Sequence, residues 1–89
     1  MNFEWDDDKN QTLLVERNLC FEMVILALDD GRLLDDLLHP NSKLYAHQKL
    51  MIVEIDGYAC AVPYIVNTDH LFLKTIYHSR AFQKKYLTG

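Results

Sequence analysis

The dipeptide Asp56-Gly57 is the feature of this sequence that most constrains its fold. An Asp-Gly pair between two apolar runs is a strong signal for a two-residue β-hairpin, because both residues of the favoured turn need positive φ angles. The runs on either side are rich in apolar and β-branched residues, over 49–55 before the turn and 58–62 after it. The sequence therefore predicts two antiparallel strands joined at this turn.

A third strand is predicted over residues 70–78, after a turn signal at 67–69. Pro63 lies within this meander, and its missing N–H group predicts a bulge or an early end to pairing. Alternation along 70–78 puts Leu71, Leu73 and Tyr77 on the core face. It puts Lys74, Ile76 and His78 together on the opposite face.

The N-terminal half predicts a short edge strand at 3–5 and two helices. The first helix begins at the aspartates of 6–8, which supply a cap and favourable first-turn charge, and it ends near Asn18. The second is indicated by apolar residues at helical spacing over 21–28, and Gly31 stops it.

Segment 32–39 is ambiguous, since its paired leucines and aspartates fit a helix whereas its length and the following Pro40 suit a strand. Residues 80–86 predict a short basic helix. The order of elements predicts one α+β domain over 1–89, with an antiparallel sheet of about four strands. Two N-terminal helices and the short C-terminal helix are expected to pack on one face of this sheet.

Charge is distributed unevenly along the 89 residues, whose net charge is −4. Residues 1–56 hold five basic and twelve acidic side chains, whereas 57–89 hold four basic and one acidic. This pattern indicates a local basic site on an acidic body. The acidic N-terminus and the lack of an apolar run of roughly 18 residues predict a cytoplasmic protein that does not enter a membrane.

The basic site predicts an anionic ligand, for which we expect RNA. Its residues are Lys74, Arg80, Lys84 and Lys85, together with His78 and Tyr86. Phosphodiester cleavage needs a cation beside the phosphate and groups that move protons, which Lys or Arg and His or Tyr can supply. Each residue also has a structural alternative: a solvated lysine, an arginine paired with an aspartate, or a packed histidine.

Metal and cofactor chemistry is not expected. Cys20 and Cys60 lie among apolar neighbours without zinc-site spacing, and we expect them to be reduced and packed. His39 and His47 flank a loop, but no third ligand follows at a recognisable spacing.

Several short motifs resemble the BrnT family of bacterial toxins. The N-terminal ones are Phe3-Glu4-Trp5-Asp6, Lys9-Asn10, Glu16-Arg17 and Phe21-Glu22. The C-terminal ones are Lys74-Thr75-Ile76, Ser79-Arg80 and Lys84-Lys85-Tyr86. The resemblance covers nearly the whole chain.

The resemblance implies a RelE-like fold and RNA cleavage that arrests translation. It implies a hetero-oligomer with a cognate antitoxin, usually a DNA-binding ribbon-helix-helix protein, and it favours a strand for the ambiguous segment. It also carries functional roles over to Arg80, Lys9 and Lys74.

The sequence thus leads to a metal-independent endoribonuclease toxin as the main hypothesis. Arg80 and Lys74 are expected to stabilise the phosphate, and His78 or His39 to act as general acid or base. The expected RNA-binding residues are Lys9, Lys49, Lys84, Lys85 and Tyr86. The alternative is a non-catalytic interaction module whose acidic half binds a basic partner.

Overall fold

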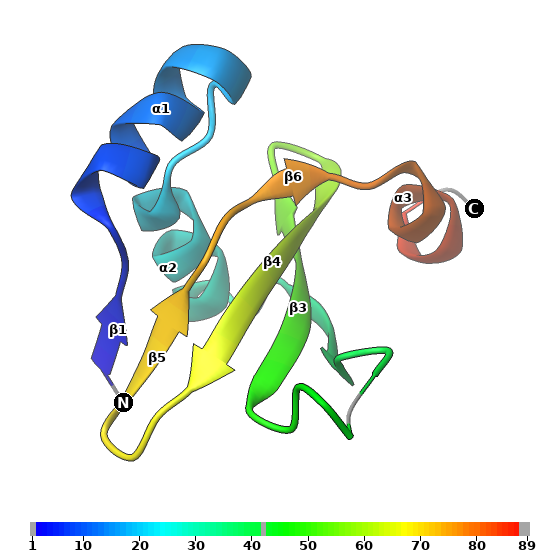
Figure 1. Ribbon diagram of the computed structural model, residues 1–89. Coiled ribbons are helices and arrows are strands. Elements are labelled where there is room, and N and C mark those ends of the chain that lie inside the picture. Colours follow the sequence, from blue (N-terminus) through cyan, green and yellow to red (C-terminus); the bar gives the residue numbers. More distant parts are fainter. Residues whose placement is uncertain (1, 42, 88–89) are drawn as a thin grey trace.

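The computed structural model describes residues 2–41 and 43–87. These residues form an α+β fold with three helices and six strands (Figure 1). In chain order the elements are β1 (Asn2–Glu4), α1 (Asp7–Arg17), α2 (Phe21–Asp29), β2 (Leu33–Leu38), β3 (Gln48–Ile55), β4 (Tyr58–Val66), β5 (His70–Leu73), β6 (Tyr77–His78) and α3 (Arg80–Tyr86). The ambiguous segment is therefore a strand, β2.

The strands form one sheet in the order β1-β5-β4-β3-β2. β6 pairs with the N-terminal part of β4, and β5 pairs with its C-terminal part. The predicted hairpin is confirmed, since Asp56 and Gly57 have φ angles of 53° and 80° and Ile55 pairs with Tyr58. β3, β4 and β5 form the predicted antiparallel meander. The expected sheet of about four antiparallel strands is wrong in two respects, because β1 runs parallel to β5 and the sheet has six strands.

The ends of the first two helices follow the sequence signals. The side chain of Asp6 accepts a hydrogen bond from the Lys9 backbone N–H at 3.1 Å, which caps α1. Asn18 ends α1 in the left-handed conformation at φ 55°, and Gly31 follows α2 at φ 73°. Capping residues and left-handed stops are local signals, so the sequence alone predicts them well.

The N-terminus of α2 is capped from another helix. Cys20 provides no side-chain cap, but Oδ1 of Asn10 in α1 accepts a hydrogen bond from the Phe21 N–H at 2.7 Å. Nδ2 of Asn10 donates to Glu22 at 2.8 Å, and this bond lowers the pKa of the Glu22 carboxyl. Asn10 is 7% exposed, so it is a buried polar link that fixes α1 against α2.

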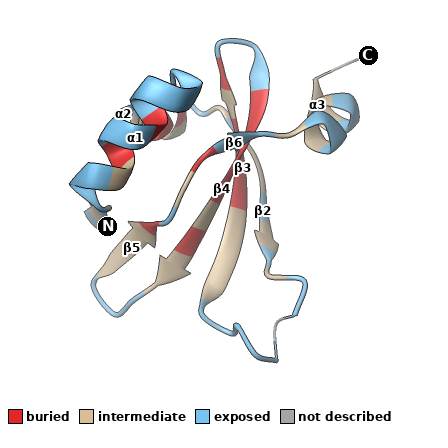
Figure 2. Cartoon of the chain, turned by 45° about the horizontal axis from the view of Figure 1, so that its top comes forward, coloured by how far each residue is buried: buried red, intermediate tan, exposed pale blue. Residues whose placement is uncertain are grey.

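The sheet has a helix layer on each face, as Figure 2 shows. α1 and α2 cover the larger core, whose fully buried members include Leu13, Phe21, Val24, Val53, Val62, Leu73 and Ile76. On the other face, Phe82, Tyr86 and Leu87 pack on a smaller cluster of Ile52, Ala59 and Ala61. The expectation that all helices share one face is therefore wrong. We call the two surfaces the α1/α2 face and the α3 face.

The predicted third strand is interrupted opposite Pro63. Leu73 pairs with Tyr64 and Tyr77 pairs with Ala61, so residues 74–76 lie opposite only 62–63. The carbonyl of Pro63 accepts the Lys74 N–H at 2.9 Å, and the proline has no N–H to return. The predicted disturbance of pairing at Pro63 is confirmed.

Three residues, 74–76, therefore lie opposite two, so this segment has one extra residue. One inserted residue reverses the alternation of side chains beyond it and so changes which of them share a face. Ile76 lies in the α1/α2 core with Leu73, and His78 pairs with Cys60 of that same core. The Lys74 N–H binds the Pro63 carbonyl, and because Leu73 before it lies in the α1/α2 core, alternation puts the Lys74 side chain on the α3 face. The prediction that Lys74, Ile76 and His78 project from one face is therefore wrong.

Candidate functional site

A cleft of about 210 Å³ opens on the α3 face of the sheet. Its floor is formed by Leu50 and Pro63, which are partners across β3 and β4. The other lining residues come from the segment after β2, the start of β3, and β6. The full lining is His39, Pro40, Gln48, Lys49, Leu50, Pro63 and Tyr77. The cleft lies beside the region that α3 covers, because Tyr77 pairs with Ala61 of the cluster under α3.

Two exposed cations lie on the segment that leads into α3. The Lys74 backbone N–H binds the carbonyl of Pro63 in the cleft lining, and Arg80 is the first residue of α3, three residues after Tyr77. Ser79 positions this helix start, since its hydroxyl accepts the Phe82 N–H at 3.3 Å and its own N–H donates to Ala59 at 3.0 Å. Neither cation forms an ion pair with any residue in 2–41 or 43–87, so both charges are available to a ligand.

His39 contributes a ring with a defined proton position. Its Nδ1 accepts the Asn41 backbone N–H at 3.0 Å, and the ring lies against Tyr45 with 4.4 Å between centroids. Because Nδ1 accepts, the neutral ring carries its proton on Nε2. The Nε2–H group can therefore donate a hydrogen bond to an anionic oxygen.

Tyr77 is the residue of the cleft that sequence reasoning missed. Simple alternation put it on the core face, but the extra residue opposite Pro63 turns it to the α3 face, where it is 39% exposed. Pro63 was the available signal, since a bulge there reverses the alternation of every later residue in the strand.

Other predicted residues lie away from the cleft. His78 is exposed on the α1/α2 side of β6, edge-on to Tyr58 at 4.9 Å between ring centroids. Lys9 belongs to the first turn of α1, on the opposite side of the sheet from α3. Lys84 is exposed on α3.

Tyr86 anchors α3 to β2. Its hydroxyl donates a short hydrogen bond to Asp35, which lowers the pKa of that carboxyl and raises the pKa of the Tyr86 phenol. Its ring stacks on Phe82 at 6.1 Å, and Lys85 Nζ lies 5.2 Å from the ring centroid. The ring is thus already packed, which argues against a role in stacking on a base.

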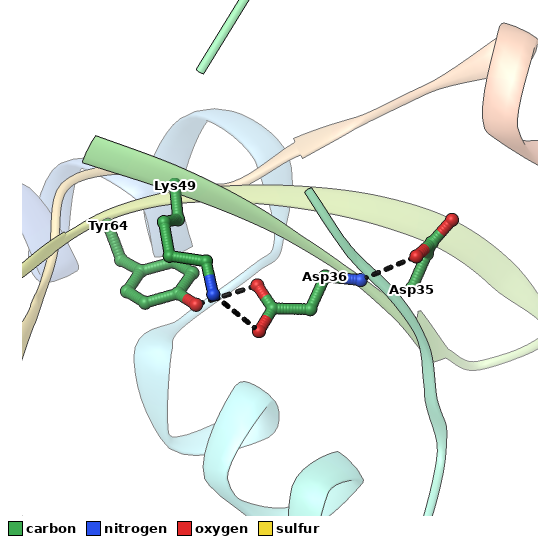
Figure 3. Close-up of polar contacts among 4 residues, drawn as sticks. All are labelled: Asp35, Asp36, Lys49 and Tyr64. Carbon is green, nitrogen blue, oxygen red and sulfur yellow. Dashed lines mark hydrogen bonds and ion pairs between the residues drawn. The ribbon is translucent and has the colours of Figure 1, made fainter. Parts of the chain in front are cut away.

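Lys49 joins a polar cluster on the α1/α2 face (Figure 3). Its ammonium lies 3.1 Å from Oδ2 of Asp36, and the Tyr64 hydroxyl donates to Oδ1 of the same carboxylate at 2.6 Å. Tyr64 is only 4% exposed, and burial together with the Asp36 carboxylate raises the pKa of its phenol. The Lys49 charge is therefore directed away from the cleft.

Apolar residues surround a second pocket, of about 200 Å³, next to this cluster. Its lining is Phe3, Leu28, Leu33, Asp36, Met51, Tyr64 and Leu71. Sequence reasoning did not foresee it, because its residues come from six elements that only long-range pairing and packing bring together.

Within residues 2–41 and 43–87, no group of three or more His, Cys, Asp or Glu side chains is arranged to hold a metal ion. No helix in that part of the chain is long and apolar enough to cross a membrane. A scan against models of known protein families and a search of the curated proteins found no match for this chain.

Proposed function

We propose that this protein is a metal-independent endoribonuclease that binds RNA in the cleft of the α3 face. The observation that carries the proposal is a cleft lined by Tyr77 and His39 next to the segment that bears two exposed cations. These cations, Lys74 and Arg80, form no ion pair with any residue in 2–41 or 43–87. The chain is acidic elsewhere, so its positive charge is concentrated where a phosphate backbone would lie.

The proposed reaction is an internal transesterification of RNA. The 2′-oxygen forms a bond to the adjacent phosphorus and the bond from phosphorus to the 5′-oxygen breaks. Water accepts the 2′-hydroxyl proton, and the leaving 5′-oxygen takes a proton from water. Arg80 and Lys74 offset the negative charge that develops on the phosphate. Tyr77 and the Nε2–H of His39 donate hydrogen bonds to phosphate oxygens, and His78, on the other side of β6, has no part in this scheme.

We further propose that the fold is RelE-like and that the protein is the toxin of a type II toxin–antitoxin pair. Two N-terminal helices on one face, a C-terminal helix on the other, and the BrnT-like motifs support this proposal. Cleavage would arrest translation, and a cognate antitoxin, of the DNA-binding ribbon-helix-helix class, would neutralise it in a hetero-oligomer.

Cleavage of labelled single-stranded RNA in EDTA tests the proposal. Arg80→Ala is expected to lower the rate by roughly 10²- to 10³-fold, the usual effect of removing a group that stabilises transition-state charge. Tyr77→Phe is expected to lower it less, because it removes one neutral donor. Lys9→Ala is the matched control, since it removes a cation from the other face and should leave the rate unchanged.

Two results would contradict the nuclease. One is an intact RNA after incubation with the wild-type protein, and the other is equal rates for wild type and Arg80→Ala. Either result would favour the alternative, a non-catalytic interaction module, for which the acidic and apolar surface of the α1/α2 face is the specific support.

A further inference from the structure

We infer that the pocket beside Asp36 is a docking surface for a basic, amphipathic segment of a partner protein. We call it the Asp36 surface and define it by the seven residues Phe3, Leu28, Leu33, Asp36, Met51, Tyr64 and Leu71. The inference goes beyond the proposed nuclease and stands on different residues, on the opposite face of the sheet.

The shape and lining of the pocket fit an apolar side chain. Five of its seven lining residues are apolar, and its volume of about 200 Å³ is below the range of about 300 to 1,000 Å³ typical of small-molecule sites. Leu33 at its rim is 46% exposed, and Leu38 on the same side of β2 is 65% exposed. A partner that buries these leucines would remove apolar area from water, which favours binding.

The charge near the pocket favours a basic partner. Asp36 is the charged residue of its lining, and Asp29, the last residue of α2, directly follows the lining residue Leu28. Lys49 offsets one of these charges through Asp36. The balance of these three side chains, Asp36, Asp29 and Lys49, is therefore negative.

The C-terminal end of α2 adds to the negative electrostatic potential near the pocket. Its carbonyl groups carry partial negative charge, and its last turn has Asp29 and no basic residue to offset them. Arg32 pairs with Asp30 at 3.2 Å, whereas Asp29 forms no ion pair with any residue in the described ranges. A lysine or arginine beside the anchoring apolar side chain would find a favourable position here.

The Asp36 carboxylate is held ready for such a contact. The Tyr64 hydroxyl at 2.6 Å and the Lys49 ammonium at 3.1 Å fix both of its oxygens, and the side chain remains 38% exposed. A preorganised acceptor loses little freedom on binding, so it contributes to specificity as well as to affinity.

A set of three designed peptides tests this surface with the full chain. The probe is a peptide of about 14 residues, four helical turns, made of lysine with leucine at helical spacing. One matched peptide has glutamate for every lysine, and another has serine for every leucine. Fluorescence anisotropy gives the affinity, and amide chemical shifts give the location.

The lysine–leucine peptide is expected to bind, to shift the amides of Leu33, Asp36, Met51 and Leu71, and to weaken as salt rises. Asp36→Asn should weaken binding about 2- to 5-fold, as for one exposed charge pair. Leu33→Ser should weaken it about 5- to 10-fold through lost apolar contact. Val15→Ser is the control, because Val15 is 84% exposed on α1 and outside the pocket, and it should bind as wild type does.

The inference would be overturned by equal binding of the glutamate or serine peptide, by shifts confined to α1 or α3, or by wild-type affinity in both Leu33→Ser and Asp36→Asn. Arg80→Ala separates the two proposals. It should bind the peptide as wild type does, whether or not it has lost RNA cleavage.

Discussion

Replacing Asn10 by alanine is expected to destabilise the whole domain, because the hydrogen bonds of this one side chain link α1 to α2. Its Oδ1 satisfies the N–H of Phe21, a residue with no solvent exposure, at 2.7 Å. Its Nδ2 holds Glu22 at 2.8 Å. The variant loses both bonds and leaves a buried donor without an acceptor.

The magnitude follows from these two losses. Leaving a buried polar group unsatisfied costs about 1–3 kcal/mol, and loss of a helix cap typically costs about 1 kcal/mol. We therefore expect the free energy of unfolding to fall by about 2–3 kcal/mol. For a domain of this size that corresponds to a fall in Tm of roughly 8–24 °C.

Urea unfolding followed by far-UV circular dichroism measures the change. Glu22→Ala is an informative variant, because it removes the acceptor of Nδ2 but keeps the Asn10 acceptor for Phe21, so its stability should be intermediate. Gln11→Ala, at the exposed neighbouring position, is the control and should stay within about 0.5 kcal/mol of wild type. A loss below 0.5 kcal/mol in Asn10→Ala would refute the capping role.

Three further predictions concern titratable groups. Burial raises the pKa of the Cys60 thiol to about 11, so a thiol reagent at pH 8 should label Cys20 in the native protein and reach Cys60 only on unfolding; equal labelling rates would contradict this. The pKa of Tyr64 is raised, so its contribution to stability is fully present below the ordinary tyrosine value of about 10 and is lost as the pH rises further. Tyr64→Phe should lower stability at pH 7 by about 1–2 kcal/mol and lose less than wild type above pH 10, as urea midpoints across pH would show. Tyr86→Phe should raise the pKa of Asp35 toward its ordinary value, and an unchanged carboxyl titration by NMR would exclude the proposed bond.

Much of the fold was predictable because its signals are local. The Asp56-Gly57 turn, the Asp6 cap, the Asn18 stop and the Gly31 stop each depend on a few adjacent residues, and all four occur as expected. Choices between distant partners were not predictable in this way. The parallel pairing of β1 with β5 and the position of α3 on the far face depend on which surfaces remain open once the rest has packed.

The candidate site shows the same division. Charge asymmetry in the sequence indicated Lys74 and Arg80; the first binds the Pro63 carbonyl of the cleft lining through its backbone, and the second begins α3. His78 and Tyr77 were placed on the wrong faces, because one extra residue opposite Pro63 reverses the alternation. No local pattern indicated that Asp36 and Tyr64 would meet, since they are 28 positions apart and joined through β3.

Cleavage of single-stranded RNA in EDTA by wild type and Arg80→Ala, with Lys9→Ala as the control, is the most direct measurement of the central claim. We predict that wild type and Lys9→Ala cut at equal rates and that Arg80→Ala is slower by roughly 10²- to 10³-fold. Cleavage by Arg80→Ala at the wild-type rate, or no cleavage by the wild-type protein, would contradict the claim that the cleft of the α3 face is a nuclease site.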